Sequence, residues 1–270
     1  MKRLLILSGK GGTGKTTVSA AIIRLSQARA IADCDVDAPN LHLIMKPSEV
    51  TPEQFVFMGG EKAAVQQNRC IGCGKCLSLC RFDAIQTENG KVSINEYACE
   101  GCGVCQFVCP EFSTATLKMG RGNSGKLVTD VKLAMLKAAP PCELAVIDGS
   151  PGIGCPVIAS VSGMDLVLIV AEPSESGISD LQRLVKTAAT FDTRLAVCIN
   201  KWNTSPMHSE KIQQYCAEQH LPFVGKIPFD PKAVQAVNEG KTIADVPCPA
   251  GDAVKEIYTA VLALLNITNE

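Results

Sequence analysis

Two short stretches of the chain carry cysteines at the same intervals, and this repetition constrains the fold of the segment that contains them. The first stretch holds Cys70, Cys73, Cys76 and Cys80, and the second holds Cys99, Cys102, Cys105 and Cys109. Each stretch reads C-x2-C-x2-C-x3-C, which indicates an internal duplication. Cysteines grouped this closely indicate metal binding. We therefore expect residues 62–118 to fold around these thiols as a small unit of their own.

This cysteine spacing is typical of bacterial ferredoxins, which bind two [4Fe-4S] clusters. In those proteins three thiolates of one run and the fourth thiolate of the other run hold the same cluster. We therefore predict one set formed by Cys70, Cys73, Cys76 and Cys109, and a second set formed by Cys80, Cys99, Cys102 and Cys105. Zinc in two four-cysteine sites is the alternative, but a zinc ribbon needs only two C-x-x-C pairs. The expected insert is a small α+β domain of the bacterial ferredoxin type.

A glycine-rich loop at residues 9–16, with the sequence GKGGTGKT, lies between an apolar run at 4–8 and a segment of helical periodicity at 16–28. A loop of this composition between a strand and a helix binds phosphate through backbone N–H groups and the helix N-terminus. Lys15 then reaches the terminal phosphates, and Thr16 binds magnesium. We predict a site for ATP or ADP with Mg2+ that is formed by Gly11, Gly12, Thr13, Gly14, Lys15, Thr16 and Thr17.

Short apolar runs separated by segments of helical periodicity predict the architecture of the rest of the chain. The runs lie at residues 4–8, 144–147, 166–171, 195–199 and 223–227. Strands that alternate with helices indicate an α/β fold with a mostly parallel sheet, and the low aromatic content of 4% suits buried strands rich in Val, Ile and Ala. Residues 62–118 interrupt this pattern. We therefore expect one discontinuous P-loop domain formed by residues 1–61 and 119–270.

Apolar residues recur at helical spacing in residues 252–265, where Lys255 is the only basic side chain. A helix on a membrane surface would carry a basic polar face, so a helix packed on the core is expected. No run of the chain approaches the ~20 apolar residues of a membrane span. The formal net charge is -1, and no basic cluster stands out. We expect a cytoplasmic protein with reduced thiols that binds neither membrane nor nucleic acid.

Three motifs resemble those of the MinD/ParA class of P-loop ATPases, to which the nitrogenase iron protein and the Mrp-type iron-sulfur carriers also belong. Lys10 and Lys15 in the glycine-rich loop resemble the deviant Walker A motif of that class. Residues 33–40, DCDVDAPN, resemble its switch I, and residues 144–152, LAVIDGSPG, resemble its Walker B strand and switch II. The complete chain resembles MinD-superfamily ATPases that contain an inserted ferredoxin domain.

This resemblance implies roles for individual residues and an assembly. Lys10 would cross to the phosphates of a facing subunit in an ATP-dependent dimer, where positive charge favours phosphoryl transfer. Asp35 would orient the attacking water, and Asp148 would bind magnesium through a water molecule. Asn200 would contact the adenine. The dimer would form with a second copy of the chain or with a related paralogue.

Six cysteines lie outside the two runs, and most of them are expected to be small core residues. They are Cys34, Cys142, Cys155, Cys198, Cys216 and Cys248. Cys34 lies within the switch I motif. Cys155 follows the switch II motif at a spacing similar to that of a cluster-binding cysteine in the nitrogenase iron protein. Cys155 is interpreted either as a ligand of a cluster shared across the dimer or as a thiol without metal.

These features lead to three functional hypotheses. In the first, closing and opening of the dimer by ATP controls electron transfer through two [4Fe-4S] clusters to a redox client protein. In the second, the chain is an ATPase that carries or assembles iron-sulfur or metal cofactors on a client, as the Mrp-type proteins do. In the third, it is a switch that binds a partner surface in its ATP state, with the ferredoxin acting as a redox sensor.

Overall fold

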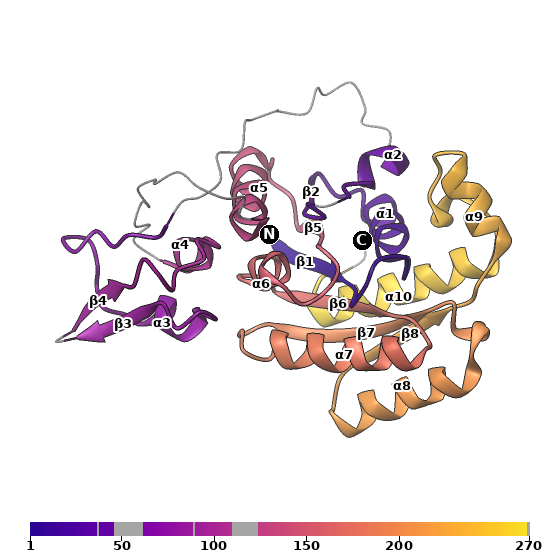
Figure 1. The fold of residues 1–270 in the computed structure, drawn as a ribbon. Coiled ribbons are helices and arrows are strands. Elements are labelled where there is room, and N and C mark those ends of the chain that lie inside the picture. Colours follow the sequence, from indigo (N-terminus) through magenta and orange to yellow (C-terminus); the bar gives the residue numbers. More distant parts are fainter. Residues whose placement is uncertain (37, 46–61, 89, 110–123, 269–270) are drawn as a thin grey trace.

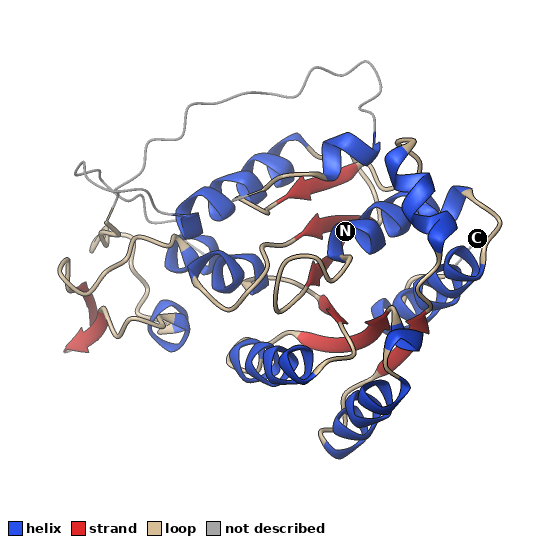
Figure 2. Cartoon of the chain, turned by 45° about the vertical axis from the view of Figure 1, so that its right-hand side comes forward, coloured by secondary structure: helices blue, strands red, loops and turns tan. Residues whose placement is uncertain are grey.

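The computed structural model describes residues 1–36, 38–45, 62–88, 90–109 and 124–268, and its largest feature is a six-stranded parallel sheet (Figures 1 and 2). In spatial order the strands are β2 (Ala30–Asp33), β5 (Leu144–Asp148), β1 (Lys2–Leu7), β6 (Leu166–Ala171), β7 (Arg194–Asn200) and β8 (Phe223–Ile227). Every neighbouring pair is parallel. The predicted α/β fold with a mostly parallel sheet is confirmed, and two of the predicted runs, 166–171 and 223–227, coincide with β6 and β8.

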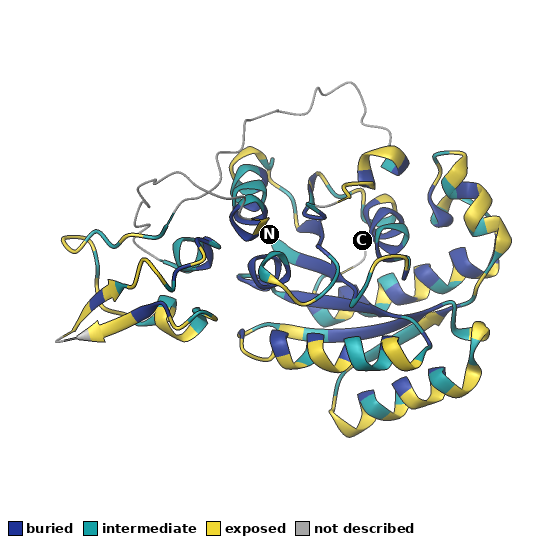
Figure 3. Cartoon of the chain, viewed as in Figure 1, coloured by how far each residue is buried: buried dark blue, intermediate teal, exposed yellow. Residues whose placement is uncertain are grey.

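Two apolar cores lie on opposite faces of this sheet, and a layer of helices covers each of them (Figure 3). Successive side chains of a strand point to opposite faces, so Leu5 and Leu7 belong to one core and Leu4 and Ile6 to the other. The first core is covered by α5 (Ser124–Ala138), α6 (Cys155–Val161), α7 (Glu175–Ala188) and α8 (Pro206–Glu218). The second core is covered by α1 (Lys15–Ser26), α2 (Leu41–Met45), α9 (Pro231–Asn238) and α10 (Pro249–Leu265).

Helix α10 settles the interpretation of the apolar stripe near the end of the chain. Its apolar residues Val254, Ile257, Val261 and Leu265 are buried in the second core. The helix packed on the core is therefore confirmed, and it begins three residues before the predicted segment because Cys248 caps it by accepting a hydrogen bond from the Gly251 N–H. Among the described residues, no helix has both the length and the apolar character needed to cross a membrane.

The described residues between 62 and 109, which we call the cysteine-rich segment, contain short helices and a two-stranded sheet separate from the large sheet. They contain α3 (Lys75–Leu79), the antiparallel strands β3 (Ile85–Glu88) and β4 (Lys91–Ile94), and α4 (Val104–Val108). This segment lies beside α5 and α6, on the side of the molecule away from α9 (Figure 1). The rest of the predicted insert, residues 110–118, lies outside the described residues, and the division into domains stays a prediction.

The cysteine-rich segment shares the first core with the helices of the large sheet. Val104 is buried in that core, and Leu79, Phe107 and Val108 pack against it. Phe107 occupies the space above Gly163, where an added Cβ would overlap the aromatic ring. Because Gly163 also has a φ of 72°, glycine meets both the steric and the backbone requirement at this contact.

Candidate functional site

The glycine-rich loop connects the end of β1 to the start of α1, as predicted. Gly14, which precedes α1, has a φ of 91°, and a Cβ at this position would overlap the Nδ2 atom of Asn200. The Asn200 amide donates to the Thr13 carbonyl at 2.7 Å, and Lys201 Nζ donates to the Gly12 carbonyl at 3.0 Å. The end of β7 therefore holds the loop in place. The adenine contact of Asn200 stays a prediction.

A buried carboxylate organises the start of α1. Asp148 lies at the end of β5 with no exposed surface, and its Oδ1 lies 2.8 Å from Lys15 Nζ. Its carboxylate also accepts hydrogen bonds from Thr16 Oγ1 at 2.8 Å and from Ser19 Oγ at 2.6 Å. Sequence reasoning missed Ser19, although it lies one helical turn after Lys15 and therefore on the same face. Asp35 is also close, with 3.6 Å between its Oδ2 and Lys15 Nζ.

The two predicted switch segments touch because β2 and β5 are neighbours. Cys34 N donates to the Asp148 carbonyl at 2.7 Å, and Ser150 Oγ donates to the Cys34 carbonyl. Burial raises the pKa of the Cys34 thiol to about 12, so Cys34 is a neutral core thiol. Asp33 accepts hydrogen bonds from the Asp35 and Leu41 N–H groups, which fixes the backbone that follows β2.

A cavity of about 550 Å³ opens above the loop and fits a mononucleotide in size. Every residue predicted to bind or act on nucleotide lines it except Asp148, which lies beneath Lys15 and Thr16. These lining residues are Lys10, Gly11, Gly12, Thr13, Gly14, Lys15, Thr16, Thr17, Asp35 and Asn200. Thr13 Oγ1 is buried there and has no hydrogen-bond partner among the described residues, which suits a ligand oxygen.

Lys10 is held by α7 and by the residues just before it. Its Nζ lies 2.8 Å from Glu172 Oε2 and 3.0 Å from Ser176 Oγ. The side chain of Lys10 is 38% exposed, so the pair lies at the edge of the nucleotide cavity. Sequence reasoning missed both partners because they lie more than 150 residues away along the chain.

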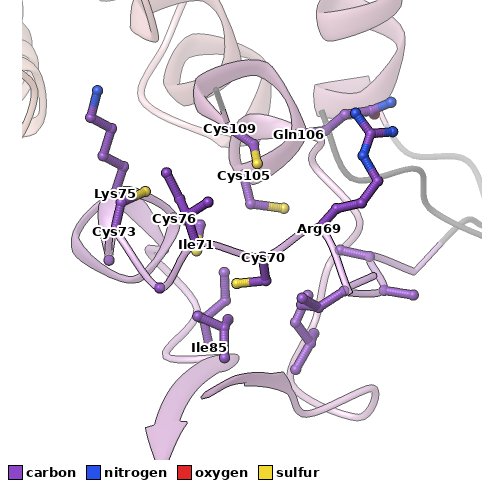
Figure 4. Close-up of a pocket in the computed structure, with 17 residues that line it drawn as sticks. Arg69, Cys70, Ile71, Cys73, Lys75, Cys76, Ile85, Cys105, Gln106 and Cys109 are labelled. Carbon is purple, nitrogen blue, oxygen red and sulfur yellow. The ribbon is translucent and has the colours of Figure 1, made fainter. Parts of the chain in front are cut away.

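The structure brings cysteines of the two runs together, while their grouping as cluster ligands stays a prediction. One cavity is lined by Cys70, Cys73, Cys76, Cys105 and Cys109, and a second one by Cys80, Cys99, Cys102 and Cys105. Figure 4 shows the thiols of Cys70, Cys76 and Cys109 around the first cavity. Cys109 thus joins the first run and Cys80 the second, while Cys105 borders both cavities. Among the described residues, no three His, Cys, Asp or Glu side chains converge on the geometry of a single metal ion.

The backbone around these thiols turns sharply at glycines. Gly74 and Gly103 have φ values of 73° and 76° and directly precede α3 and α4. The pKa of Cys102 is raised to about 11 and that of Cys105 to about 12, mainly by burial and to a smaller extent by negative charge on neighbouring thiolates. Half-buried thiols that repel one another as thiolates suit a bound cationic metal, which stabilises the deprotonated form.

Cys155, the first residue of α6, lies next to the second cysteine set. A Cβ added to Gly125 would come within 3.1 Å of Cys102 Cβ and 3.2 Å of Cys155 Cβ. Gly125 of α5 therefore fits between the two cysteines, and the start of α6 adjoins the second set. The segment between Asp148 and Cys155 connects this contact directly to the nucleotide cavity.

A parallel sheet whose first strand leads through a glycine-rich loop to a lysine and a threonine, with a buried aspartate on the adjacent strand, defines a P-loop nucleotide-binding protein. The family model described as the CobQ/CobB/MinD/ParA nucleotide binding domain matches residues 4–243. The chain belongs to this family of ATPases.

Several known proteins are similar to this chain over nearly its whole length. An uncharacterized protein of Methanocaldococcus jannaschii is 31% identical and covers 95% of both chains. An iron-sulfur cluster carrier protein of Methanococcus maripaludis is 21% identical, covering 96% of this chain and 84% of its own. The septum site-determining protein MinD of Pyrococcus horikoshii, solved with Mg-ADP, superposes with a TM-score of 0.57 at 18% identity, over 98% of this chain and 97% of that one. At that identity the likeness shows the fold alone.

Proposed function

We propose that this ATPase couples a nucleotide-driven change of a dimer to electron transfer through two [4Fe-4S] clusters, which serve a client protein. One observation carries the proposal: the start of α6, which follows the predicted switch II segment, adjoins the second cysteine set across Gly125. The helix that follows the predicted switch II segment and the predicted second cluster set therefore adjoin each other in one subunit.

The residues of the nucleotide site have the chemistry that ATP hydrolysis needs. Lys15 places positive charge at the terminal phosphates, and Thr16 with Asp148 would hold the magnesium ion, which neutralises developing charge. Asp35 would orient the attacking water. Lys10 would supply a second positive charge from one subunit to the phosphates held by the other.

The two cysteine sets differ in the exposure of one member each, and this difference gives the proposed path a direction in space. Cys73 of the first set is exposed, and the neighbouring Ile71 is 64% exposed. Cys99 of the second set is buried, and Cys102 adjoins α5 and α6. The clusters would supply one-electron redox chemistry. The exposed surface at Ile71 and Cys73 is then the docking side for the client.

The proposal is tested by redox titration with EPR detection on anaerobically prepared protein, with and without a nonhydrolysable ATP analogue and Mg2+. We expect two clusters, and we expect the analogue to shift the potential or the signal of at least one of them. Two clusters that both ignore the analogue would contradict the coupling. Absence of clusters from protein reconstituted with iron and sulfide would contradict the cysteine assignment itself.

Carriage of clusters is the second candidate, because an iron-sulfur cluster carrier protein is among the similar proteins. The two candidates differ in what leaves the protein. A carrier would release iron and sulfide to an apo-ferredoxin acceptor in an ATP-dependent manner, whereas an electron-transfer protein would reduce its client and keep its iron. Iron analysis of both proteins after separation distinguishes these outcomes.

Replacing Glu172 with glutamine is expected to favour the ATP-dependent dimer. The change removes the charge that holds Lys10 within its own subunit at 2.8 Å and keeps the size of the side chain. Because a partly exposed ion pair contributes about 0.2–1 kcal/mol, we expect dimer formation about 1.4- to fivefold tighter. Analytical ultracentrifugation with ATP and Mg2+ measures this, with the exposed Glu210→Gln as control. A dimer that forms no more readily than wild type would show that Glu172 does not compete for Lys10.

A further inference from the structure

We propose that α5 mechanically joins α6 to α4, so that nucleotide-dependent movement of α6 reaches the second cysteine set through Gly125 and Lys132. This inference rests on the proposed function and names the residues that would carry its coupling. Lys132 and Gly125 are positioning residues, since they act through the carbonyls of α6, the Phe107 ring, Cys102 and Cys155.

The first connection lies at the start of α6. Gly125 packs closely between Cys102 and Cys155, and a Cβ there would also lie 3.2 Å from the Cys155 carbonyl oxygen, a tight contact. One helical turn later, Thr129 Oγ1 donates to the Cys102 carbonyl at 2.9 Å. The beginning of α5 is therefore packed and hydrogen-bonded to the second cysteine run while it touches the first residue of α6.

The second connection lies at the other end of α6. Lys132 is fully buried, and its Nζ donates to three carbonyls at and just after the last turn of α6. They belong to Ala159 at 2.7 Å, Ser160 at 2.9 Å and Ser162 at 2.6 Å. Carbonyls at a helix C-terminus lack partners within the helix and favour positive charge. Lys132 therefore caps α6 from the neighbouring helix.

The same ammonium group contacts the cysteine-rich segment. Lys132 Nζ lies 4.2 Å from the ring centroid of Phe107 in α4, a cation–π distance. Full burial lowers the pKa of Lys132 to about 7. The three carbonyls and the Phe107 ring lie where they favour the charged form. One buried side chain thus binds the end of α6 and the helix that carries Cys105.

The nucleotide loop reaches these connections through the segment before α6. Gly152 N donates to the Ser8 carbonyl at 3.0 Å, next to the glycine-rich loop. From Gly152 the chain runs three residues to Cys155, where α6 begins. Both ends of α6 are therefore attached to α5, and α5 is attached to α4. Because a close-packed interior transmits displacement, a shift of α6 displaces α4 as well.

Hydrogen exchange with mass spectrometry on the cluster-loaded protein tests this connection, with and without a nonhydrolysable ATP analogue and Mg2+. In wild type we expect the analogue to slow exchange about threefold or more in peptides covering 10–17, 155–161 and 104–108. In Lys132→Met we expect the response at 104–108 to be lost while the response at 10–17 remains. The control Lys137→Met changes an exposed lysine of the same helix and should behave as wild type.

A second variant covers the case in which Lys132→Met fails to fold. Phe107→Leu removes the ring and leaves the three carbonyl contacts of Lys132 in place, so its response at 104–108 should weaken while that at 155–161 remains. A wild type without a response at 104–108, or a Phe107→Leu protein that keeps the full response, overturns the inference.

The same samples separate this inference from the proposed function. If the analogue shifts a cluster signal in wild type and the shift survives in both variants, the coupling stands and α5 does not carry it. If exchange at 104–108 responds to nucleotide while no cluster signal does, α5 transmits the movement and the proposed redox coupling fails.

Discussion

Replacing Lys10 with alanine is expected to slow ATP hydrolysis about 10³-fold while nucleotide binding changes little. A positive charge supplied to the transferring phosphoryl group by a second subunit contributes about 10³–10⁵ to the rate, because charge builds up there in the transition state. In the structure Lys10 Nζ pairs with Glu172 and Ser176 at the edge of the nucleotide cavity. It is therefore available for exchange into a facing site.

Single-turnover hydrolysis together with equilibrium binding of a fluorescent ATP analogue separates the two effects. Lys15→Ala provides the contrast. Lys15 belongs to the phosphate loop, and its Nζ lies 2.8 Å from Asp148 Oδ1 of the same subunit. Its loss should therefore weaken nucleotide binding as well as hydrolysis. Lys186→Ala, an exposed change on α7, is the control. Equal rates in Lys10→Ala and wild type would remove Lys10 from the reaction. Mixing Lys10→Ala with a binding-deficient Lys15→Ala chain should restore part of the hydrolysis, because the intact lysine then faces the intact loop.

Pairs of cysteine substitutions are expected to reveal how the two runs share their clusters. With two [4Fe-4S] clusters the protein should bind about eight iron atoms per chain. In the interleaved arrangement Cys80→Ser with Cys102→Ser damages one set and should leave about four iron atoms. Cys80→Ser with Cys73→Ser damages both sets and should leave almost none. Iron and sulfide analysis of anaerobically reconstituted protein measures the result.

An arrangement in which each run holds its own cluster predicts the reverse iron contents for these two pairs. The separate cavities that include Cys109 with the first run and Cys80 with the second favour the interleaved result. Cys142→Ser is the control, because Cys142 lines neither cavity and contacts Met1 instead. About eight iron atoms in either pair would contradict both arrangements, because each of them predicts the loss of at least one cluster from either pair.

The features predicted correctly from the sequence depend on residue type and on the order of short segments along the chain. The apolar runs become β strands because each is buried between helices, and the phosphate loop needs glycine where Gly14 adopts a φ of 91°. Lys15, Thr16 and Asp148 meet because neighbouring parallel strands end at the same edge of the sheet. The cavities place Cys109 with the first run and Cys80 with the second, and the ligand sets themselves stay a prediction.

The features that sequence reasoning missed depend on contacts between distant segments. Nothing in the local pattern of α5 distinguishes Lys132 from the exposed Lys137 on the same helix, yet Lys132 has no exposed surface. Its role appears only when the end of α6 and the ring of Phe107 come together around it. Glu172 is similar, because it follows β6 whereas its partner Lys10 follows β1. These two strands are neighbours in the sheet but lie far apart in the sequence. Long-range pairing of this kind leaves no periodic signal.

The order of the strands in the sheet also determines which parts of the protein can fold first during synthesis. Among the described strands of the large sheet, only β1 and β2 precede the cysteine-rich segment, and they do not pair with each other. β2 pairs with β5, and β1 pairs with β5 and β6. A chain that leaves the ribosome N-terminus first therefore presents all eight run cysteines before any strand of the large sheet has its neighbour. Metal loading of the nascent segment can precede the nucleotide site, whose buried Asp148 arrives only with β5.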